Sequence, residues 1–312
     1  MQRQNHLLTL KDWDSDRIVE TINTAIKLKK ELKESGSSSR FRGQTIGMFF
    51  EKPSLRTFTT FQVGIHQFGG MPVELDPGSI GLGKRESIVD VARCLSRWVN
   101  AIVVRCFEQK LVEQLAEHGN IPVINALTDD FHPCQALAFG QTLLEQKGSF
   151  AGQTIAFIGD GNNVANSLMI LAAKLGMNFT LACPKGFEQD SALIEWAQPW
   201  FNKHGTKYRV FNNPQDAVKD ATVLYGDVWV SMGQESQKDS KQSHFLPFQI
   251  NRELLDLAPS ECKISHCLPA NRGEEITDEI MDDLKVNWAF EEAENRLHAQ
   301  KAVLWQLMQP SF

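Results

Sequence analysis

The sequence predicts an α/β protein with two doubly wound parallel-sheet domains joined by inter-domain helices. Short apolar runs typical of buried strands alternate with longer amphipathic segments typical of helices, and this alternation stops near Lys147 and begins again at Thr154. The chain has 312 residues, which is more than one compact hydrophobic core usually holds. We therefore expect two sheets, each covered by helices on both faces.

The first series of elements begins with a helix. Its start is predicted by the acidic stretch Asp12–Asp16, and its end by the glycine- and serine-rich stretch Ser35–Ser39. Strands are then expected at Thr45–Phe50, Pro72–Leu75, Ala101–Val104 and Pro122–Asn125. Helices are expected at Ser54–Phe68, Glu86–Val99 and Glu108–His118, with a glycine-rich loop at Asp76–Gly83 and a helix at His132–Gln146 that joins the domains.

The second series repeats this alternation. Strands are expected at Thr154–Ile158, Asn178–Ala182, Tyr208–Phe211, Thr222–Tyr225 and Cys262–Ser265. Helices are expected at Asn163–Leu175, Asp190–His204, Pro214–Lys219, Thr277–Leu284 and Ala293–Leu307. The polar stretch Asp227–Pro247, rich in serine and glutamine, predicts a long mobile loop, and loops of this length often carry function.

Charge and cysteine usage exclude several classes of protein. The formal net charge of −6 at pH 7 argues against a nucleic-acid partner, because such proteins carry a basic face. The six cysteines are irregularly spaced without a CxxC pair, which favours reduced thiols in a cytoplasmic protein over a disulfide framework or a zinc site. We expect no signal peptide and no membrane partner, since no apolar run is long enough for either.

Polar side chains follow the predicted strands at their carboxyl ends, which is where doubly wound sheets bind ligands. These side chains are Ser54, Arg56, Thr57, Arg105, His132, Asn163, Asp227 and Cys267. Ser54 opens a helix whose first-turn N–H groups carry the positive end of the helix dipole, and Arg56 adds a planar cation, so this turn suits a phosphate. A purely structural N-cap at Ser54 and a buried inert thiol at Cys267 are the alternatives.

Four motifs carry a resemblance that extends over nearly the whole chain. They are Ser54-Leu55-Arg56-Thr57, His132-Pro133-Cys134-Gln135, Asp227-Val228-Trp229-Val230-Ser231-Met232-Gly233 and His266-Cys267-Leu268-Pro269-Ala270. Together they resemble the aspartate/ornithine carbamoyltransferase family. The resemblance implies a carbamoyl-phosphate-binding domain of residues 1–147, with a helix at 292–312 packing back on it, and an ornithine-binding domain of residues 148–291. The active site is expected between them.

The activity implied by the resemblance is transfer of the carbamoyl group from carbamoyl phosphate to the side-chain amine of L-ornithine, giving citrulline and phosphate. The chemistry needs no metal and no cofactor, and the implied assembly is a homotrimer or a multiple of trimers. The implied carbamoyl-phosphate-binding residues are Ser54, Leu55, Arg56, Thr57, Arg105, His132, Gln135 and Arg296. The implied ornithine-binding residues are Asn163, Asp227, Ser231, Met232, Cys267 and Leu268. Arg105, His132 and Cys267 are the implied catalytic residues.

The sequence departs from the family pattern at a few positions. Leu55 stands in the first motif where Thr is usual, and Phe58 stands directly after that motif where Arg is usual. Phe139 stands where ornithine enzymes usually have Asp, and Asn271 stands where they usually have His. Helical spacing places Phe58 on an apolar stripe with Leu55, Phe61, Ile65 and Phe68, so we expect it to pack in the interior.

These departures leave alternatives open. One is a carbamoyltransferase for another amine, such as an N-acylornithine, putrescine or aspartate, and another is a non-catalytic relative of the family. A third reads Gly159-Asp160-Gly161 as part of a dinucleotide-binding motif, although the expected third glycine and a ribose-binding acid are missing.

Overall fold

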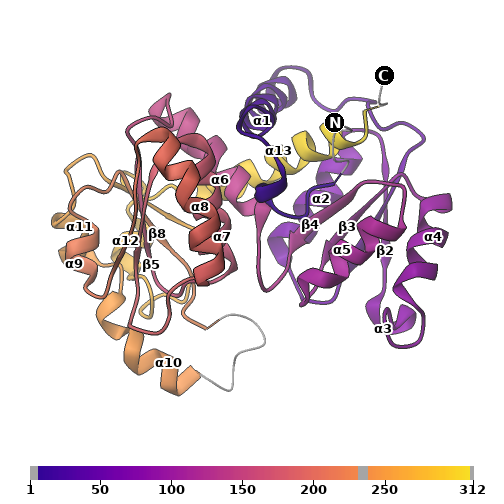
Figure 1. Ribbon diagram of the computed structural model, residues 1–312. Coiled ribbons are helices and arrows are strands. Elements are labelled where there is room, and N and C mark those ends of the chain that lie inside the picture. Colours follow the sequence, from indigo (N-terminus) through magenta and orange to yellow (C-terminus); the bar gives the residue numbers. More distant parts are fainter. Residues whose placement is uncertain (1–5, 231–237, 310–312) are drawn as a thin grey trace. The chain divides into compact units, whose positions relative to one another are not determined.

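The computed structural model describes residues 6–230 and 238–309 of a chain that forms two compact units. Unit 1 comprises residues 1–141 and 294–312, and unit 2 comprises residues 142–293. Each contains one sheet in which every strand pair is parallel, which confirms the predicted fold class (Figure 1). Over the described part of the chain, no helix combines the length and apolar character needed to span a membrane.

The sheet of unit 1 has the strand order β2-β1-β3-β4. Its strands are β1 (Thr45–Phe50), β2 (Met71–Leu75), β3 (Ala101–Arg105) and β4 (Val123–Leu127). All residues of the central strand β3 are buried, as expected for an apolar run covered on both faces. The register places Phe50, at the end of β1, opposite Arg105, at the end of β3. Side chains that follow these two strands therefore meet at one edge of the sheet.

Helices cover both faces of this sheet. The helices of unit 1 are η1 (Leu10–Asp12), α1 (Ser15–Ser35), α2 (Leu55–Gln67), α3 (Pro77–Ile80), α4 (Ile88–Trp98) and α5 (Gln109–His118); α6 (Pro133–Lys147) and α13 (Ala289–Leu307) each continue between the units. Because parallel crossovers are right-handed, α2 lies on one face, and α4 and α5 pack together on the other.

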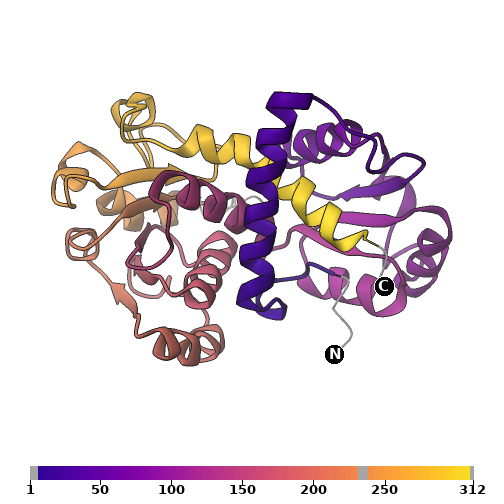
Figure 2. The ribbon, with the colours of Figure 1, turned by 90° about the horizontal axis from the view of Figure 1, so that it is seen from above.

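The unit 1 part of α13 packs on α2 and is crossed by α1. Gly64 of α2 allows the approach, since a Cβ there would lie 2.9 Å from Lys301 Cγ. Lys29 of α1 donates to Asn295 at 2.7 Å, and α1 runs across α13 in Figure 2. These contacts hold the unit 1 part of the last helix against α2, the helix that directly follows β1.

The sheet of unit 2 has the strand order β7-β6-β5-β8-β9. Its strands are β5 (Thr154–Ile158), β6 (Asn178–Ala182), β7 (Tyr208–Phe211), β8 (Val223–Gly226) and β9 (Lys263–His266). Its helices are α7 (Asn163–Leu175), α8 (Ser191–His204), α9 (Pro214–Ala217), α10 (Lys238–Phe245), η3 (Leu246–Phe248), α11 (Arg252–Asp256) and α12 (Asp278–Asp282). Figure 1 shows α7 and α8 on one face of the sheet, and α9, α11 and α12 on the other.

Three sequence expectations about secondary structure need correction. The stretch Asp227–Pro247, expected to be a loop, contains α10, whose Phe245 is fully buried and packs beside Trp229 with ring centroids 6.1 Å apart. The final helix begins at Ala289 rather than at Ala293. Helix α3 also lies within the predicted glycine-rich loop, where Asp76 caps it.

Candidate active site

In each sheet, the direction in which the chain adds strands reverses at one position. Many of the predicted site residues follow the strands next to that position. In unit 1 the chain leaves β1 toward β2 and then crosses to β3, so the reversal lies between β1 and β3. In unit 2 it lies between β5 and β8. Ligands of doubly wound sheets bind beyond the carboxyl ends of the strands at such a reversal. Each unit thus has one expected ligand position.

The turn after β1 is built as an N-terminal helix cap. Ser54 has extended backbone angles, and its hydroxyl accepts a hydrogen bond of 3.2 Å from the Thr57 backbone N–H. This geometry is compatible with both interpretations of Ser54, a structural N-cap and part of a phosphate-binding turn. The cap occupies only some of the free backbone N–H groups in the first turn of a helix. Arg56 is half-buried in that turn, and Thr57 points inward and is buried.

A buried group of five side chains, which we call the anion cluster, lies in unit 1. Its members are Thr57, Arg105, His132, Gln135 and Arg296. Arg296 of α13 donates to Thr57 Oγ1 at 2.6 Å and also donates to Gln135 Oε1. Three helices far apart in sequence therefore present polar atoms to one another in the anion cluster, which includes two guanidinium groups. Buried cations of this kind are typical of sites that bind an anion.

His132 immediately precedes α6 and is almost fully buried. Its carbonyl oxygen accepts from the backbone N–H groups of Gln135 and Ala136, at 3.1 and 3.3 Å, which fixes its backbone at the start of the helix. Burial, and then the positive charges of Arg296 and Arg105, hold the pKa of His132 well below 6.5. The imidazole is therefore neutral at physiological pH and can donate one N–H to an oxygen without adding charge.

Lys52 is a site candidate that sequence reasoning missed. Its side chain is only 4% exposed, it forms an ion pair with Asp129, and its ammonium lies 4.3 Å from the centroid of the Phe107 ring. Its position in the sequence could have indicated it, because Lys52 follows β1 at the same sheet edge as Arg105. A buried lysine paired with Asp129 therefore lies at the edge of the unit 1 sheet where the predicted residues follow their strands.

In unit 2, the ends of β8 and β9 bring Asp227 and Cys267 together. The Cys267 thiol donates to Asp227 Oδ1 at 2.8 Å, and Asp227 Oδ2 accepts from Asn162 Nδ2 at 2.7 Å. The backbone N–H of Val228 also donates to Asp227 Oδ1, at 2.8 Å. Burial raises the pKa of Asp227, while His266 and these three donors oppose the rise. A buried carboxylate held by hydrogen bonds suits an ammonium ligand.

Of the remaining predicted residues of unit 2, Asn163 and Leu268 are described, and they directly follow Asn162 and Cys267 in the chain. Asn163 is the first residue of α7 and is half-buried. Leu268 has a φ of 55°, a left-handed conformation that is rare for residues with side chains and clusters at functional sites. Its N–H donates to His266 Nδ1 at 2.9 Å. Ser231 and Met232 lie outside the described residues.

Two family models cover almost the entire chain. The model described as "Aspartate/ornithine carbamoyltransferase, carbamoyl-P binding domain" matches residues 5–145, and the one described as "Aspartate/ornithine carbamoyltransferase, Asp/Orn binding domain" matches residues 151–307. The chain belongs to the aspartate/ornithine carbamoyltransferase family. The resemblance seen in the four motifs is thereby confirmed.

Relatives within this family are similar to the chain in sequence and in structure. The chain is 46% identical over 303 residues to an ornithine carbamoyltransferase of Thermococcus kodakarensis, covering 97% of this chain and 96% of the relative. It is 44% identical over 301 residues to one of Anoxybacillus flavithermus, covering 96% of each. The solved ornithine carbamoyltransferase of Pyrococcus furiosus superposes with a TM-score of 0.93 at 43% identity, covering 96% of this chain and 95% of that one.

The departures from the family pattern have different structural consequences. Leu55 is 76% exposed, so the predicted apolar stripe does not include it. Phe61 is fully buried, whereas Phe58 is half-buried and meets the edge of the Phe50 ring with centroids 5.2 Å apart. Phe139 is fully buried in α6, and Asn271 is exposed, with its backbone N–H donating to a buried glutamate at 2.6 Å.

The glycines after β5 have a packing function that accounts for the dinucleotide-like pattern. The Gly161 N–H donates to the Phe187 carbonyl at 2.9 Å, and a Cβ at position 161 would lie only 2.6 Å from the Gln189 nitrogen. Asp160, between the glycines, forms a 2.6 Å ion pair with Lys241. Glycine is required here because two loops of the protein touch, so the pattern gives no support to a nucleotide site.

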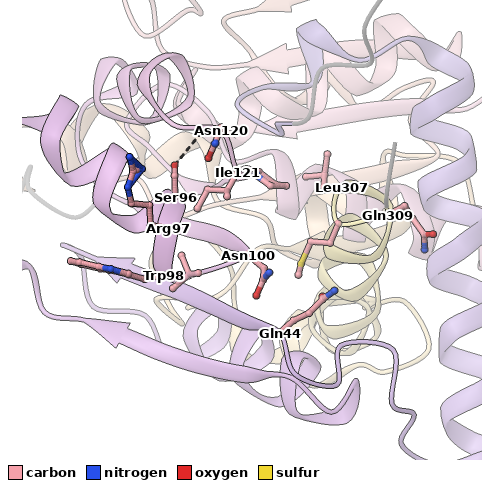
Figure 3. A pocket seen from close by; sticks show the side chains of 12 residues that line it. Gln44, Ser96, Arg97, Trp98, Asn100, Asn120, Ile121, Leu307 and Gln309 are labelled. Carbon is pink, nitrogen blue, oxygen red and sulfur yellow. Dashed lines mark hydrogen bonds between the residues drawn. The ribbon is translucent and has the colours of Figure 1, made fainter. Parts of the chain in front are cut away.

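A pocket of about 380 Å³ lies at the opposite, amino-terminal edge of the unit 1 sheet (Figure 3). It is lined by Gln44 and Asn100, which precede β1 and β3, and by Arg97, Trp98 and Gln309 among others. None of the predicted site residues lines it. The pocket is therefore separate from the anion cluster.

Proposed function

We propose that this chain transfers the carbamoyl group of carbamoyl phosphate to the side-chain amine of L-ornithine, giving citrulline and phosphate. The observation that carries the proposal is the anion cluster, in which Arg296 joins Thr57 to Gln135 beside Arg105 and His132. The thiol–carboxylate pair of Asp227 and Cys267 in unit 2 supports ornithine as the acceptor. The relatives named above carry the same activity in their names.

In unit 1 the proposed task is to hold carbamoyl phosphate and stabilise the leaving phosphate. We assign the phosphate to the first turn of α2, formed by residues 54–57, and to Arg105. His132, Gln135 and Arg296 then contact the carbamoyl group. Negative charge develops on the carbonyl oxygen as the amine attacks, and donors fixed in a buried site stabilise it without having to reorganise. A neutral His132 donates one hydrogen bond there, and the two guanidinium groups supply the positive field.

In unit 2 the proposed task is to align ornithine. Asp227 binds the α-ammonium group. Asn163, Ser231 and Met232 bind the remaining polar atoms at the α-carbon, and Ser231 and Met232 are assigned by family resemblance alone. Cys267 and the Leu268 carbonyl receive the side-chain amine. That amine attacks as a neutral nucleophile, the bond from the carbonyl carbon to the phosphate oxygen breaks, and one proton leaves the nitrogen. Correct alignment can lower such a barrier by as much as about 7–11 kcal/mol.

We further propose that the protein assembles as a homotrimer or a multiple of trimers in the cytoplasm. Leu55 and Met71 of unit 1 are 76% and 61% exposed, so apolar surface is available near α2 and the edge strand β2. Lys84 and Arg85 are exposed in the loop between α3 and α4, where they could bind the phosphate in a neighbouring subunit's site. All six cysteines are free thiols, which fits a reducing compartment. Analytical ultracentrifugation tests the assembly, and a monomer at micromolar concentration would contradict it.

The function is tested by measuring carbamoyl transfer from carbamoyl phosphate to L-ornithine, aspartate, putrescine and N-acetylornithine in parallel. We expect product with L-ornithine at a kcat/KM at least about a hundredfold above the other three amines, because only ornithine combines an α-ammonium for Asp227, an α-carboxylate and a free side-chain amine. Preference for another amine would identify a different acceptor. No product with any of them would identify a non-catalytic relative.

A matched pair of variants separates the anion cluster from general effects of charge. Arg105→Gln removes a buried guanidinium of the anion cluster, whereas Arg97→Gln removes an exposed one at the opposite edge of the same sheet. Arg105→Gln should abolish most activity, and Arg97→Gln should leave it unchanged.

A further inference from the structure

Asn162 makes different hydrogen bonds with the two ends of its side-chain amide. Its Oδ1 atom accepts from the backbone N–H groups of Val164 and Ala165, at 3.0 and 3.1 Å, and thereby caps α7. Its Nδ2 atom donates to Asp227 Oδ2 at 2.7 Å. The orientation of the amide is fixed by chemistry, because backbone N–H groups only donate and a carboxylate only accepts. A flipped amide would lose both sets of bonds.

The bond from Asn162 completes the support of a buried carboxylate. Asp227 is 6% exposed, and its other oxygen accepts from the Cys267 thiol and from the Val228 N–H, both at 2.8 Å. Both carboxylate oxygens therefore have donors before any ligand arrives. An ionised carboxylate at such a depth depends on these bonds, since burial disfavours its charge.

We propose that Asn162 is a positioning residue for the acceptor amino acid, orienting the Asp227 carboxylate and keeping it ionised. The same amide fixes the start of α7, where Asn163 is the first helical residue. One side chain thereby sets the geometry of two proposed ornithine contacts without touching the ligand itself. This inference rests on the proposed function, because it assigns the ammonium of ornithine to Asp227.

Other titratable groups also face the Asp227 carboxylate. They are His266 and Cys267 at the end of β9, and Tyr225 in β8, whose hydroxyl donates to the buried Glu292 of α13. In the loop of Asn162 itself the charged residue is Asp160, which forms an ion pair with Lys241 of α10. Removing a donor from Asp227 while these groups stay in place destabilises its charged form, so its pKa rises.

The first test is Asn162→Ser. Serine caps helices as well as asparagine does, but its shorter side chain does not reach Asp227. We expect kcat/KM for ornithine to fall roughly ten- to a hundredfold, mostly through KM, with KM for carbamoyl phosphate unchanged. The Asp227 pKa, measured in the ligand-free protein by carboxyl ¹³C NMR with Asp227→Asn to identify the signal, should rise. Asn251→Ser is the matched control, since Asn251 caps α11 in the same unit through the Leu254 N–H at 2.9 Å.

The second test is Asn162→Asp, which keeps the size and the cap but places a carboxylate oxygen where the NH₂ group meets Asp227. The two acids should titrate as a coupled pair with one strongly raised pKa, above that of the serine variant. This variant decides the question if Asn162→Ser does not fold. Wild-type KM for ornithine and wild-type Asp227 pKa in both variants would overturn the proposal. If the wild-type protein does not carbamoylate ornithine, the function is wrong, while the Asp227 pKa in the variants still confirms or refutes the coupling to Asn162.

Discussion

Arg296 of α13 donates a hydrogen bond of 2.6 Å to Thr57 Oγ1 of α2, although 239 positions separate the two residues in the sequence. The same guanidinium donates to Gln135 of α6, and all three side chains are buried. The last helix of the chain thus completes the anion cluster that begins after β1. A planar guanidinium suits this position, because its diverging donors reach two acceptors at once.

We expect Arg296→Lys to weaken carbamoyl phosphate binding by roughly ten- to a hundredfold, because an ammonium has no planar fork with which to hold both Thr57 and Gln135. Calorimetric titration measures the change. Arg272→Lys is the matched control, since Arg272 also donates to two side chains, those of Asp278 and Asp282, but at an exposed position of unit 2. Equal affinities in the two variants would mean that Arg296 only supports packing.

The buried, neutral His132 predicts a loss of stability in mild acid. Burial, with Arg296 and Arg105 nearby, keeps the folded-state pKa of His132 well below the unfolded value of 6.5. Below pH 6.5 the unfolded chain therefore binds a proton that the folded chain does not, and the free energy of unfolding falls as the pH falls, by up to about 1.4 kcal/mol per pH unit until the folded pKa is reached.

Urea unfolding at several pH values between about 4 and 8 measures this slope on either side of the ordinary histidine pKa. His132→Gln should flatten it below pH 6.5, whereas His66→Gln, at an exposed position on α2, should not. A slope unchanged by His132→Gln would assign the acid sensitivity to other groups.

Most of the fold could be predicted from local patterns. The nine strands in the described part of the chain begin and end within two residues of their predicted bounds, because buried parallel strands are short apolar runs between turn residues. Helix α10 was missed since its sequence is polar almost throughout. Its stability comes from the burial of Phe245 against Trp229, which is a tertiary contact that no local period reveals.

The candidate site could be predicted only in part. Residues at strand ends were recognisable, because the topology of a doubly wound sheet brings those ends together. Arg296 was predicted by family resemblance alone, and nothing local indicated that it joins Thr57 to Gln135. Asn162 was missed as a positioning residue, since a sequence shows the cap but not the carboxylate that approaches its other end.

Substitution of Cys267 tests whether its thiol contacts ornithine or has only a packing role. Cys267→Ala removes the donor to Asp227, so it should lower kcat, weaken ornithine binding and leave carbamoyl phosphate affinity near wild type. Cys267→Ser, which keeps a donor, should retain more of the ornithine affinity. Cys262→Ala, a buried thiol just before the same strand, is the control. An unchanged kcat/KM for ornithine in Cys267→Ala would return Cys267 to a structural role.

Phe58, one of the departures from the family pattern, is less buried than its helical spacing predicts. Its ring is half-buried and packs edge-on against Phe50, so Phe58→Ala should cost only about 1–2 kcal/mol of unfolding free energy. Phe61→Ala, one helical turn further along α2 and fully buried, should cost about 3–5 kcal/mol and is the matched comparison. Chemical denaturation measures both.

The affinity for carbamoyl phosphate decides what Phe58 means for function. Phe58 lies on the same helix as Thr57, but its ring contacts Phe50 rather than the anion cluster, so Phe58→Ala should leave the affinity per folded molecule unchanged. Phe58→Arg restores the residue usual in the family and should likewise change little, because the cations of the anion cluster are already present in Arg105 and Arg296. A gain of about tenfold or more in Phe58→Arg, which is worth about 1.4 kcal/mol of binding, would instead show that Phe58 marks a weakened phosphate site. That result would favour a non-catalytic relative over the enzyme proposed above.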